Sequence, residues 1–261
     1  MRRYAITQAD LEAAIGDRWL RRARERTERF RQAGRYEEAA GIWSEVKDVY
    51  VQLQHGKCAY CERRIGTDPV YAGELDVEHY RPKSGYYLLA YHPLNYAVAC
   101  IRCNRGLKRD EFPVAGTRMW DGEDPRSMRA ERPLLVYPIG EVDEDPAELI
   151  TFVGYAAVPA GSSERGRRTI EFFRLGAEAE RDDDLVTERA RVVRALYMAN
   201  ELLRAGRMVS EFGDEIAFAQ SPAAPHSQCA ASFQRVCESD WGQAELLFRA
   251  AGDFLRSKGL L

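Results

Sequence analysis

Apolar side chains recur at helical spacing near the start of the chain and again towards its end. Residues 7–33 are expected to form a helix, with Thr7 able to cap its first turn and Gly34 directly after its last. Residues 36–54 carry a second set of apolar side chains three and four positions apart, which predicts another helix. Gly56 follows the end of that helix closely.

Two short β-like runs, 134–137 and 149–153, flank an acidic loop over residues 138–146. Helical periodicity resumes near residue 167 and is strongest over 185–203. The alternation of these patterns predicts an α+β fold that is mostly helical.

The clearest loop of the second half covers residues 220–227, which include Pro222 and Pro225. Two helices are expected after it. The last one begins after Asp240, with Gln243 three residues later in the pattern of a capping box.

The middle of the chain interrupts this periodicity and contains four of the cysteines. We therefore divide the sequence into an N-terminal helical region (1–55), an irregular central region (56–116) and a mixed, then helical, region (117–261). The last region is expected to pack on the centre as one structural unit.

Composition and charge narrow the class of protein. The chain of 261 residues is 45% hydrophobic and 30% charged, which is typical of a folded globular protein. Its 38 Lys and Arg against 41 Asp and Glu leave a net charge of −3, so any nucleic-acid contact must come from a local patch. No apolar run is long enough to span a membrane, and the polar N-terminus shows no apolar stretch of the kind found in a signal peptide. We expect a cytoplasmic protein without a membrane partner.

The spacing of the cysteines indicates a metal. Four of the six form two C-x-x-C pairs, Cys58 with Cys61 and Cys100 with Cys103. Four thiolates can close a tetrahedral shell around Zn²⁺ and leave no open position, which predicts a structural zinc site. Unrelated buried cysteines, a redox pair, or a site in which His55 replaces one ligand are the alternatives. Cys229 and Cys237 lie near one helical face and are expected in a core.

A second cluster lies between the zinc pairs. Glu78 stands beside His79 at the end of a predicted strand, and Asn104 follows the second cysteine pair. Carboxylate and amide oxygens suit Mg²⁺ or Mn²⁺, and a neutral histidine can take a proton from an attacking water. This combination suits metal-assisted hydrolysis of a phosphodiester. Asp76 is a further carboxylate near the site, and His92 is either a second histidine of the site or a surface residue.

The charge around this cluster is uniformly positive. From His79 to Arg109 the chain has no acidic residue. The basic side chains there are Arg81, Lys83, Arg102, Arg105, Lys108 and Arg109. As a set they predict a phosphate-binding face, and the first five are the candidate substrate-binding residues. A merely solvated surface is the alternative for each of them.

These motifs resemble a known family. The order is Cys58-x-x-Cys61, then Val-Glu-His-Tyr-Arg-Pro-Lys-Ser over 77–84, then Leu-Asn-Tyr-Ala-Val-Ala-Cys-x-x-Cys-Asn-Arg over 94–105. It resembles the HNH (ββα-metal) endonucleases and, more narrowly, the PtuB-like nucleases of Septu and retron anti-phage systems. The close match covers roughly residues 56–113. It departs from the family at Arg109, where glycine is usual, and over 91–94.

The resemblance implies a central zinc-braced ββα-metal unit flanked by N-terminal and C-terminal helices. By position, His79 is the general base and Asn95 ties the hairpin together and orients that base. Glu78 and Asn104 are the ligands of the catalytic Mg²⁺ or Mn²⁺, and the four cysteines hold the structural zinc.

The function expected from these motifs is metal-dependent hydrolysis of phosphodiester bonds, most readily of DNA. The resemblance implies a nuclease effector of anti-phage defence that works with an ATPase partner, since the chain has no Walker A pattern of its own. Two alternatives remain: a nuclease for structured RNA such as tRNA, and an inactive zinc-braced adaptor that binds nucleic acid or protein.

Overall fold

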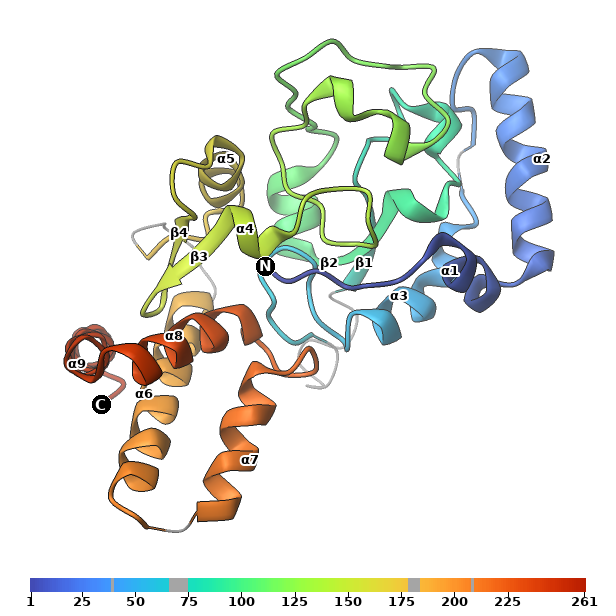
Figure 1. Cartoon of the computed structure of the whole chain (residues 1–261). Coiled ribbons are helices and arrows are strands. Elements are labelled where there is room, and N and C mark those ends of the chain that lie inside the picture. The colour runs from blue at the N-terminus through green and yellow to red at the C-terminus, as the bar shows by residue number, and fades with distance from the viewer. Residues whose placement is uncertain (39, 66–74, 178–183, 208) are drawn as a thin grey trace. The chain divides into compact units, whose positions relative to one another are not determined.

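The computed structural model describes residues 1–38, 40–65, 75–177, 184–207 and 209–261 (Figure 1). The chain divides into two compact units, which are described separately. The N-terminal unit contains Arg3–Tyr60 and Arg64–Pro146. The C-terminal unit contains Met1–Arg2, Cys61–Arg63 and Ala147–Leu261. The residues after 116 are therefore shared between the two units.

The N-terminal unit begins with two helices where one was expected. Helix α1 spans Gln8–Ile15 and α2 spans Asp17–Ala33. The prediction of a single helix over 7–33 was wrong because Gly16 breaks it, with φ at 89° and ψ at 149°. The predicted cap is confirmed, since Thr7 Oγ1 accepts a hydrogen bond from the backbone N–H of Asp10 at 3.1 Å.

The second predicted helix is shorter than 36–54. A 3₁₀ turn, η1 (Trp43–Val46), leads into α3 (Lys47–Leu53). Within the predicted range, residues 36–38 and 40–42 are not helical. Residue 39 lies outside the described residues. The segment before η1 instead contacts α2: the indole Nε1–H of Trp19 donates a hydrogen bond to the Ile42 carbonyl at 2.9 Å. Tertiary packing here overrides the apolar periodicity.

A two-stranded antiparallel sheet lies at the centre of the N-terminal unit. Strands β1 (Leu75–His79) and β2 (Tyr96–Cys100) pair in a register that sets His79 opposite Tyr96. All residues of β2 are buried. A short π-type helical segment, η4 (Arg102–Lys108), follows β2 directly. Residues 75–108 thus contain two paired strands followed by a short helical segment.

The other described residues of the N-terminal unit form loops and short 3₁₀ turns. These turns are η2 (Tyr87–Leu89), η3 (Pro93–Asn95), η5 (Pro125–Ser127) and η6 (Arg129–Glu131). The run 134–137, predicted as a strand, is largely buried but joins neither sheet. Leu134 donates its backbone N–H to the Pro113 carbonyl at 2.9 Å, which ties this run to the loop after η4.

The C-terminal unit starts with a hairpin and a helix. After α4 (Pro146–Leu149), strand β3 (Ile150–Val153) pairs antiparallel with β4 (Ala156–Pro159). The second β-like run therefore forms a strand, but its partner is β4. Helix α5 (Glu164–Phe173) follows the hairpin.

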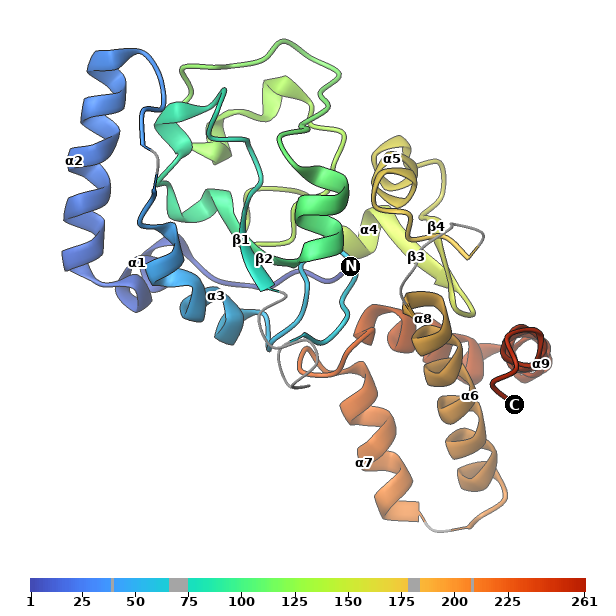
Figure 2. The ribbon, with the colours of Figure 1, turned by 180° about the vertical axis from the view of Figure 1, so that it is seen from behind.

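The later part of the C-terminal unit is mostly helical in its described residues (Figure 2). Its helices are α6 (Leu185–Arg204), α7 (Val209–Gln220), α8 (Ser227–Ser239) and α9 (Trp241–Ser257). The predicted cap of the last helix is confirmed, with the Gln243 N–H donating to Asp240 Oδ1 at 2.9 Å. Stacking of Tyr197 on Phe248, with ring centroids 4.3 Å apart, packs α6 against α9. Helix α7 was not predicted.

The described residues form two small sheets and mostly helices, which confirms the expected α+β, mostly helical class. A search of the same residues finds no helix with the length and apolar character needed to cross a bilayer.

The break between α1 and α2 leads to a stability prediction. Gly16 has a backbone conformation that is open essentially to glycine alone, so Gly16→Ala is expected to lower the free energy of unfolding by about 1–3 kcal/mol. Gly213, inside α7, has ordinary helical φ and no atom within 4 Å of an added Cβ. Gly213→Ala is therefore expected to raise the same quantity by about 0.4–1 kcal/mol. The urea unfolding midpoints of the two variants test these predictions. Shifts of the same sign would contradict the special backbone role of Gly16.

Candidate metal centre and polar pocket

The four cysteines of the two C-x-x-C pairs lie together. The sulfur atoms of Cys58, Cys61, Cys100 and Cys103 are all buried and all within 4.8 Å of one another. Tetrahedral Zn²⁺ with Zn–S bonds of about 2.3 Å requires sulfurs roughly 3.8 Å apart, so the cluster fits zinc with small adjustments. The backbone N–H of Cys103 donates to Cys100 Sγ at 3.4 Å, which helps to turn the second pair inward. The structure therefore brings together all four predicted zinc ligands.

The other two cysteines are buried in the C-terminal unit. Burial raises the pKa of Cys229 to about 12 and that of Cys237 to about 11, so both remain protonated thiols at neutral pH. This agrees with the core role expected for them.

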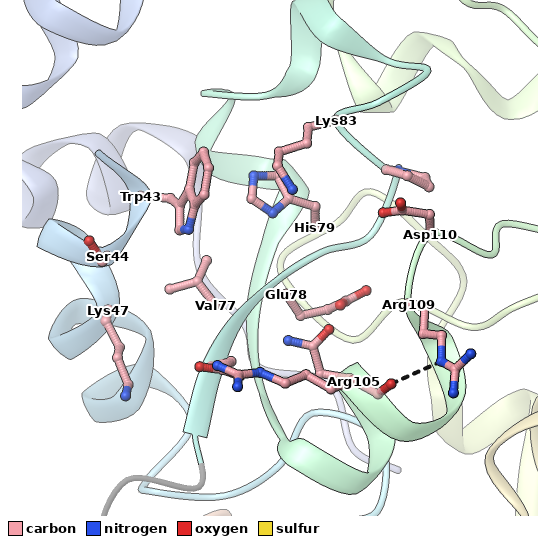
Figure 3. A pocket seen from close by; sticks show the side chains of 13 residues that line it. Trp43, Ser44, Lys47, Val77, Glu78, His79, Lys83, Arg105, Arg109 and Asp110 are labelled. Atoms are coloured by element: carbon pink, nitrogen blue, oxygen red, sulfur yellow. Dashed lines mark hydrogen bonds and ion pairs between the residues drawn. The ribbon is translucent and has the colours of Figure 1, made fainter. Parts of the chain in front are cut away.

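A second site, a polar pocket, lies in the N-terminal unit (Figure 3). Its volume is about 510 Å³, and it is lined from β1, η4, the loop after each of them, and the segment of η1 and α3. The lining residues are Trp43, Ser44, Lys47, Asp76, Val77, Glu78, His79, Pro82, Lys83, Asn104, Arg105, Arg109 and Asp110. Three predicted residues, Glu78, His79 and Asn104, thus line one cavity.

His79 is held as a neutral base. Its Nε2 lies 3.2 Å from the Ala90 carbonyl oxygen, and because that oxygen only accepts, Nε2 carries the proton and Nδ1 keeps its lone pair. The rings of Trp43 and Tyr96 each meet the imidazole edge-on at 5.0 Å. Burial, with a smaller effect of Lys83, lowers the pKa of His79 to about 3. The imidazole is therefore uncharged at physiological pH, and Nδ1 carries the lone pair that a general base uses.

Glu78 has a buried counter-charge. Lys108 Nζ lies 2.7 Å from Glu78 Oε1, and the Tyr60 hydroxyl donates to the same oxygen at 3.2 Å. Burial raises the pKa of the Glu78 carboxyl, and the ammonium of Lys108 opposes that effect. The same ammonium donates to the His79 carbonyl at 2.9 Å. Since both side-chain bonds fall on Oε1, the second oxygen of Glu78 is the one available to another ligand.

Asn95 lies outside the pocket lining and holds the loop that follows His79. Its side-chain amide donates to the carbonyls of Arg81 and Leu89 at 2.9 and 3.1 Å, and its carbonyl accepts the Arg81 N–H at 2.8 Å. Leu89 immediately precedes Ala90, whose carbonyl orients the His79 ring. Asn95 therefore acts on the histidine through the backbone.

Two of the five predicted substrate-binding residues are buried and paired inside the fold. Arg81 Nε lies 2.8 Å from Glu131, and the two side chains are 2% and 0% exposed. Lys108 is fully buried against Glu78. Neither presents its charge to a ligand. The interpretation of Arg81 and Lys108 as exposed phosphate contacts thus does not agree with their position in the structure.

The other three lie nearer the surface. Lys83 lines the pocket with its ammonium 5.2 Å from the centre of the Trp43 ring. Arg105 also lines it and pairs with Asp76 at 2.5 Å. Arg102 is partly exposed and is not part of the pocket lining.

Two further histidines were candidates in the sequence. His92 Nδ1 accepts the Leu94 N–H at 3.1 Å and so caps η3, and burial lowers its pKa to about 4. It lines a different cavity, beside α2. His55 does not belong to the four-cysteine cluster.

One wall of the pocket is formed by residues that belong to no motif of the sequence. Trp43, Ser44 and Lys47 come from the N-terminal helical region, which has no chemical motif, and all three lie in the segment 36–54 that the apolar periodicity predicts as a helix. Arg109 and Asp110 line the opposite side. Only the tertiary structure shows that these residues border the site.

No family model matches the chain. It is 29% identical to the Septu protein PtuB of Bacillus mycoides over 168 residues, which is 59% of this chain and 52% of that protein. It is 31% identical to the Septu protein PtuB of Bacillus thuringiensis over 80 residues, 30% of this chain and 28% of that protein. The chain resembles Septu PtuB proteins. It spans about half the length of the first relative and less of the second, and the likeness agrees with the resemblance seen in its motifs.

The cysteine cluster predicts a metal content. Purified protein should contain about one zinc per chain, and Cys100→Ser should lose it together with part of the folding free energy. Cys237→Ala, which removes a buried thiol far from any C-x-x-C pair in the sequence, should keep the zinc. Elemental analysis after gel filtration measures both. Equal zinc in the two variants would rule out the cluster as the site.

The buried pair of Arg81 and Glu131 predicts a structural role. Arg81→Met leaves the Glu131 charge buried without its partner, and is expected to lower the free energy of unfolding by about 3–5 kcal/mol. Lys83→Met removes a partly exposed cation without a carboxylate partner among the described residues, and should change it by about 0.5 kcal/mol or less. Urea unfolding of both variants measures these changes. Similar losses of unfolding free energy in Arg81→Met and Lys83→Met would contradict the structural role of Arg81.

Proposed function

We propose that this protein is a metal-dependent HNH-type endonuclease that hydrolyses phosphodiester bonds, with DNA as its substrate. The observation that carries the proposal is the polar pocket, where His79 offers an unprotonated nitrogen beside the oxygen ligands Glu78 and Asn104. Lys83 and Arg105 line the same cavity and supply positive charge for a phosphate. The likeness to Septu PtuB proteins supports a role in Septu anti-phage defence.

The donor set of the pocket fits a hard divalent cation. Glu78 and Asn104 would hold Mg²⁺ or Mn²⁺ through one carboxylate oxygen and one amide oxygen, and this ion type commonly keeps several waters beside few protein ligands. Among the described residues the cysteine cluster alone gathers three or more Cys, His, Asp or Glu ligands, so a cation at Glu78 would depend on water and phosphate for its other positions. When bound, the ion would stabilise negative charge on the scissile phosphate and the leaving oxygen.

The chain's own residues would then act as follows. His79 takes a proton at Nδ1 from the attacking water, while its Nε2–H remains bound to the Ala90 carbonyl. Asn95 keeps that carbonyl in place through the loop backbone. Lys83 binds a phosphate oxygen directly, and Arg105 can do so by leaving Asp76.

The biological setting follows from the relatives. Because they are Septu proteins, we propose that this chain is the nuclease effector of a cytoplasmic anti-phage system and that an ATPase partner controls it. Co-expression with an ATPase encoded beside it should give co-elution, and failure to co-elute would remove the partner from the proposal.

The central test compares cleavage by the wild type and by His79→Ala at equal zinc content. Plasmid DNA and total tRNA are incubated with Mg²⁺ or Mn²⁺, with and without the partner. His79→Ala and Asn104→Ala should lower the rate at least a hundredfold, because each removes a catalytic or metal-binding group.

The matched control is His92→Asn, whose side-chain oxygen can still accept the Leu94 N–H, and it should cleave like the wild type. Cleavage of tRNA instead of DNA would move the proposal to a ribonuclease. Nucleic-acid binding without cleavage under every condition would support an inactive adaptor and reject the nuclease.

A further inference from the structure

One wall of the polar pocket comes from the N-terminal helical region. Trp43 and Ser44 of η1 and Lys47 of α3 line it. Figure 3 shows Ser44 and Lys47 on one side of the pocket and Arg109 with Asp110 on the other, with His79 and Glu78 between them. The candidate catalytic groups are therefore bordered by a lysine on one side and an arginine on the other.

The cations of the pocket differ in whether an acidic side chain already neutralises them. Arg105 is paired with Asp76 at 2.5 Å. For Lys47, Lys83 and Arg109, no ion pair with a carboxylate occurs within the part of the chain that the structure describes. These three charges remain available to an anionic ligand.

The acidic residues next to Lys47 in the sequence do not cancel its charge. Glu45 is paired with Arg22 at 2.7 Å, and this hydrogen bond lowers the pKa of the Glu45 carboxyl. Asp48 is exposed and is not part of the pocket lining. Of the charged residues at 45, 47 and 48, only Lys47 faces the cavity.

We propose that Lys47 binds a backbone phosphate of the substrate on the side of the scissile bond opposite to Arg109. The substrate is then a polynucleotide strand that crosses the pocket from the α3 wall to the end of η4, passing His79 and Glu78. This inference rests on the proposed nuclease function and specifies how the same site holds its substrate. Contacts to flanking phosphates position a strand without reading its sequence, and each contact makes binding depend on salt.

The proposal separates long substrates from short ones. A strand of several nucleotides reaches both walls, whereas a small diester such as bis(p-nitrophenyl) phosphate carries one phosphate and gains nothing from a flanking contact. In Lys47→Ala, the ratio of kcat/KM for a 12-nucleotide DNA to that for the small diester should fall about tenfold. Lys47→Arg keeps the charge and should restore most of the ratio.

Binding gives a second readout that does not need cleavage. The binding of a labelled 12-nucleotide single-stranded DNA is measured by fluorescence anisotropy at KCl concentrations from about 50 to about 300 mM. Phosphate contacts make the binding constant fall steeply over this range. All variants are made in the His79→Ala chain. Lys47→Ala should weaken binding and lower the slope of log K against log salt by about 0.7, the value for one phosphate contact on a single strand. The control is Lys258→Ala, which makes the same charge change at the end of α9 and should leave the slope unchanged.

The outcomes separate the role of Lys47 from the nuclease function. Equal slopes for Lys47→Ala and Lys258→Ala, or an unchanged substrate ratio, would overturn the role of Lys47 even if His79-dependent cleavage is observed. A Lys47-dependent slope in a protein that hydrolyses neither substrate would support the strand path and overturn the nuclease. A labelled RNA of the same sequence shows whether the path accepts ribose.

Discussion

The site depends on one buried ion pair, between Glu78 and Lys108. A carboxylate that is 2% exposed is costly to keep charged without a partner, and Lys108, which has no exposed surface, supplies that partner at 2.7 Å. Because Lys108 is the last residue of η4 and Glu78 lies in β1, the pair fixes the helical segment against the strand. The second bond of Lys108, to the His79 carbonyl, fixes the backbone of the candidate base in the same way.

The cysteine cluster and this ion pair act on the same short segment from its two ends. Cys100 ends β2 and Cys103 lies in η4, so a bound zinc would hold the start of η4 while Lys108 holds its end. Asn104 lies between these two restraints and lines the pocket. A side chain placed in this way loses little further freedom on binding a ligand, which favours a defined site on a segment too short to be stable alone.

The basic residues from His79 to Arg109, and those of the pocket, have different roles. Arg81 and Lys108 neutralise buried carboxylates, and Arg105 pairs with Asp76 at the pocket. Lys83, Arg109 and Lys47 carry the charge that remains available to a phosphate in the cavity. Three of the six basic side chains from His79 to Arg109 therefore pair with carboxylates of the fold, and one cation of the pocket, Lys47, comes from outside this stretch.

The sequence alone determined the groups that depend on local spacing. Each C-x-x-C pair predicts two neighbouring thiolates, adjacent Glu78 and His79 predict a polar strand end, and Thr7 and Asp240 predict helix starts, because each of these patterns acts within a few residues. Only the tertiary structure decided which charges are buried. Arg81 and Lys83 are both basic residues of the same motif, two positions apart, but only Arg81 forms an ion pair with Glu131, fifty residues away. The same holds for the wall formed by Trp43 and Lys47 and for the break at Gly16. Burial and long-range pairing depend on what packs against a residue, and the neighbouring sequence does not contain that information.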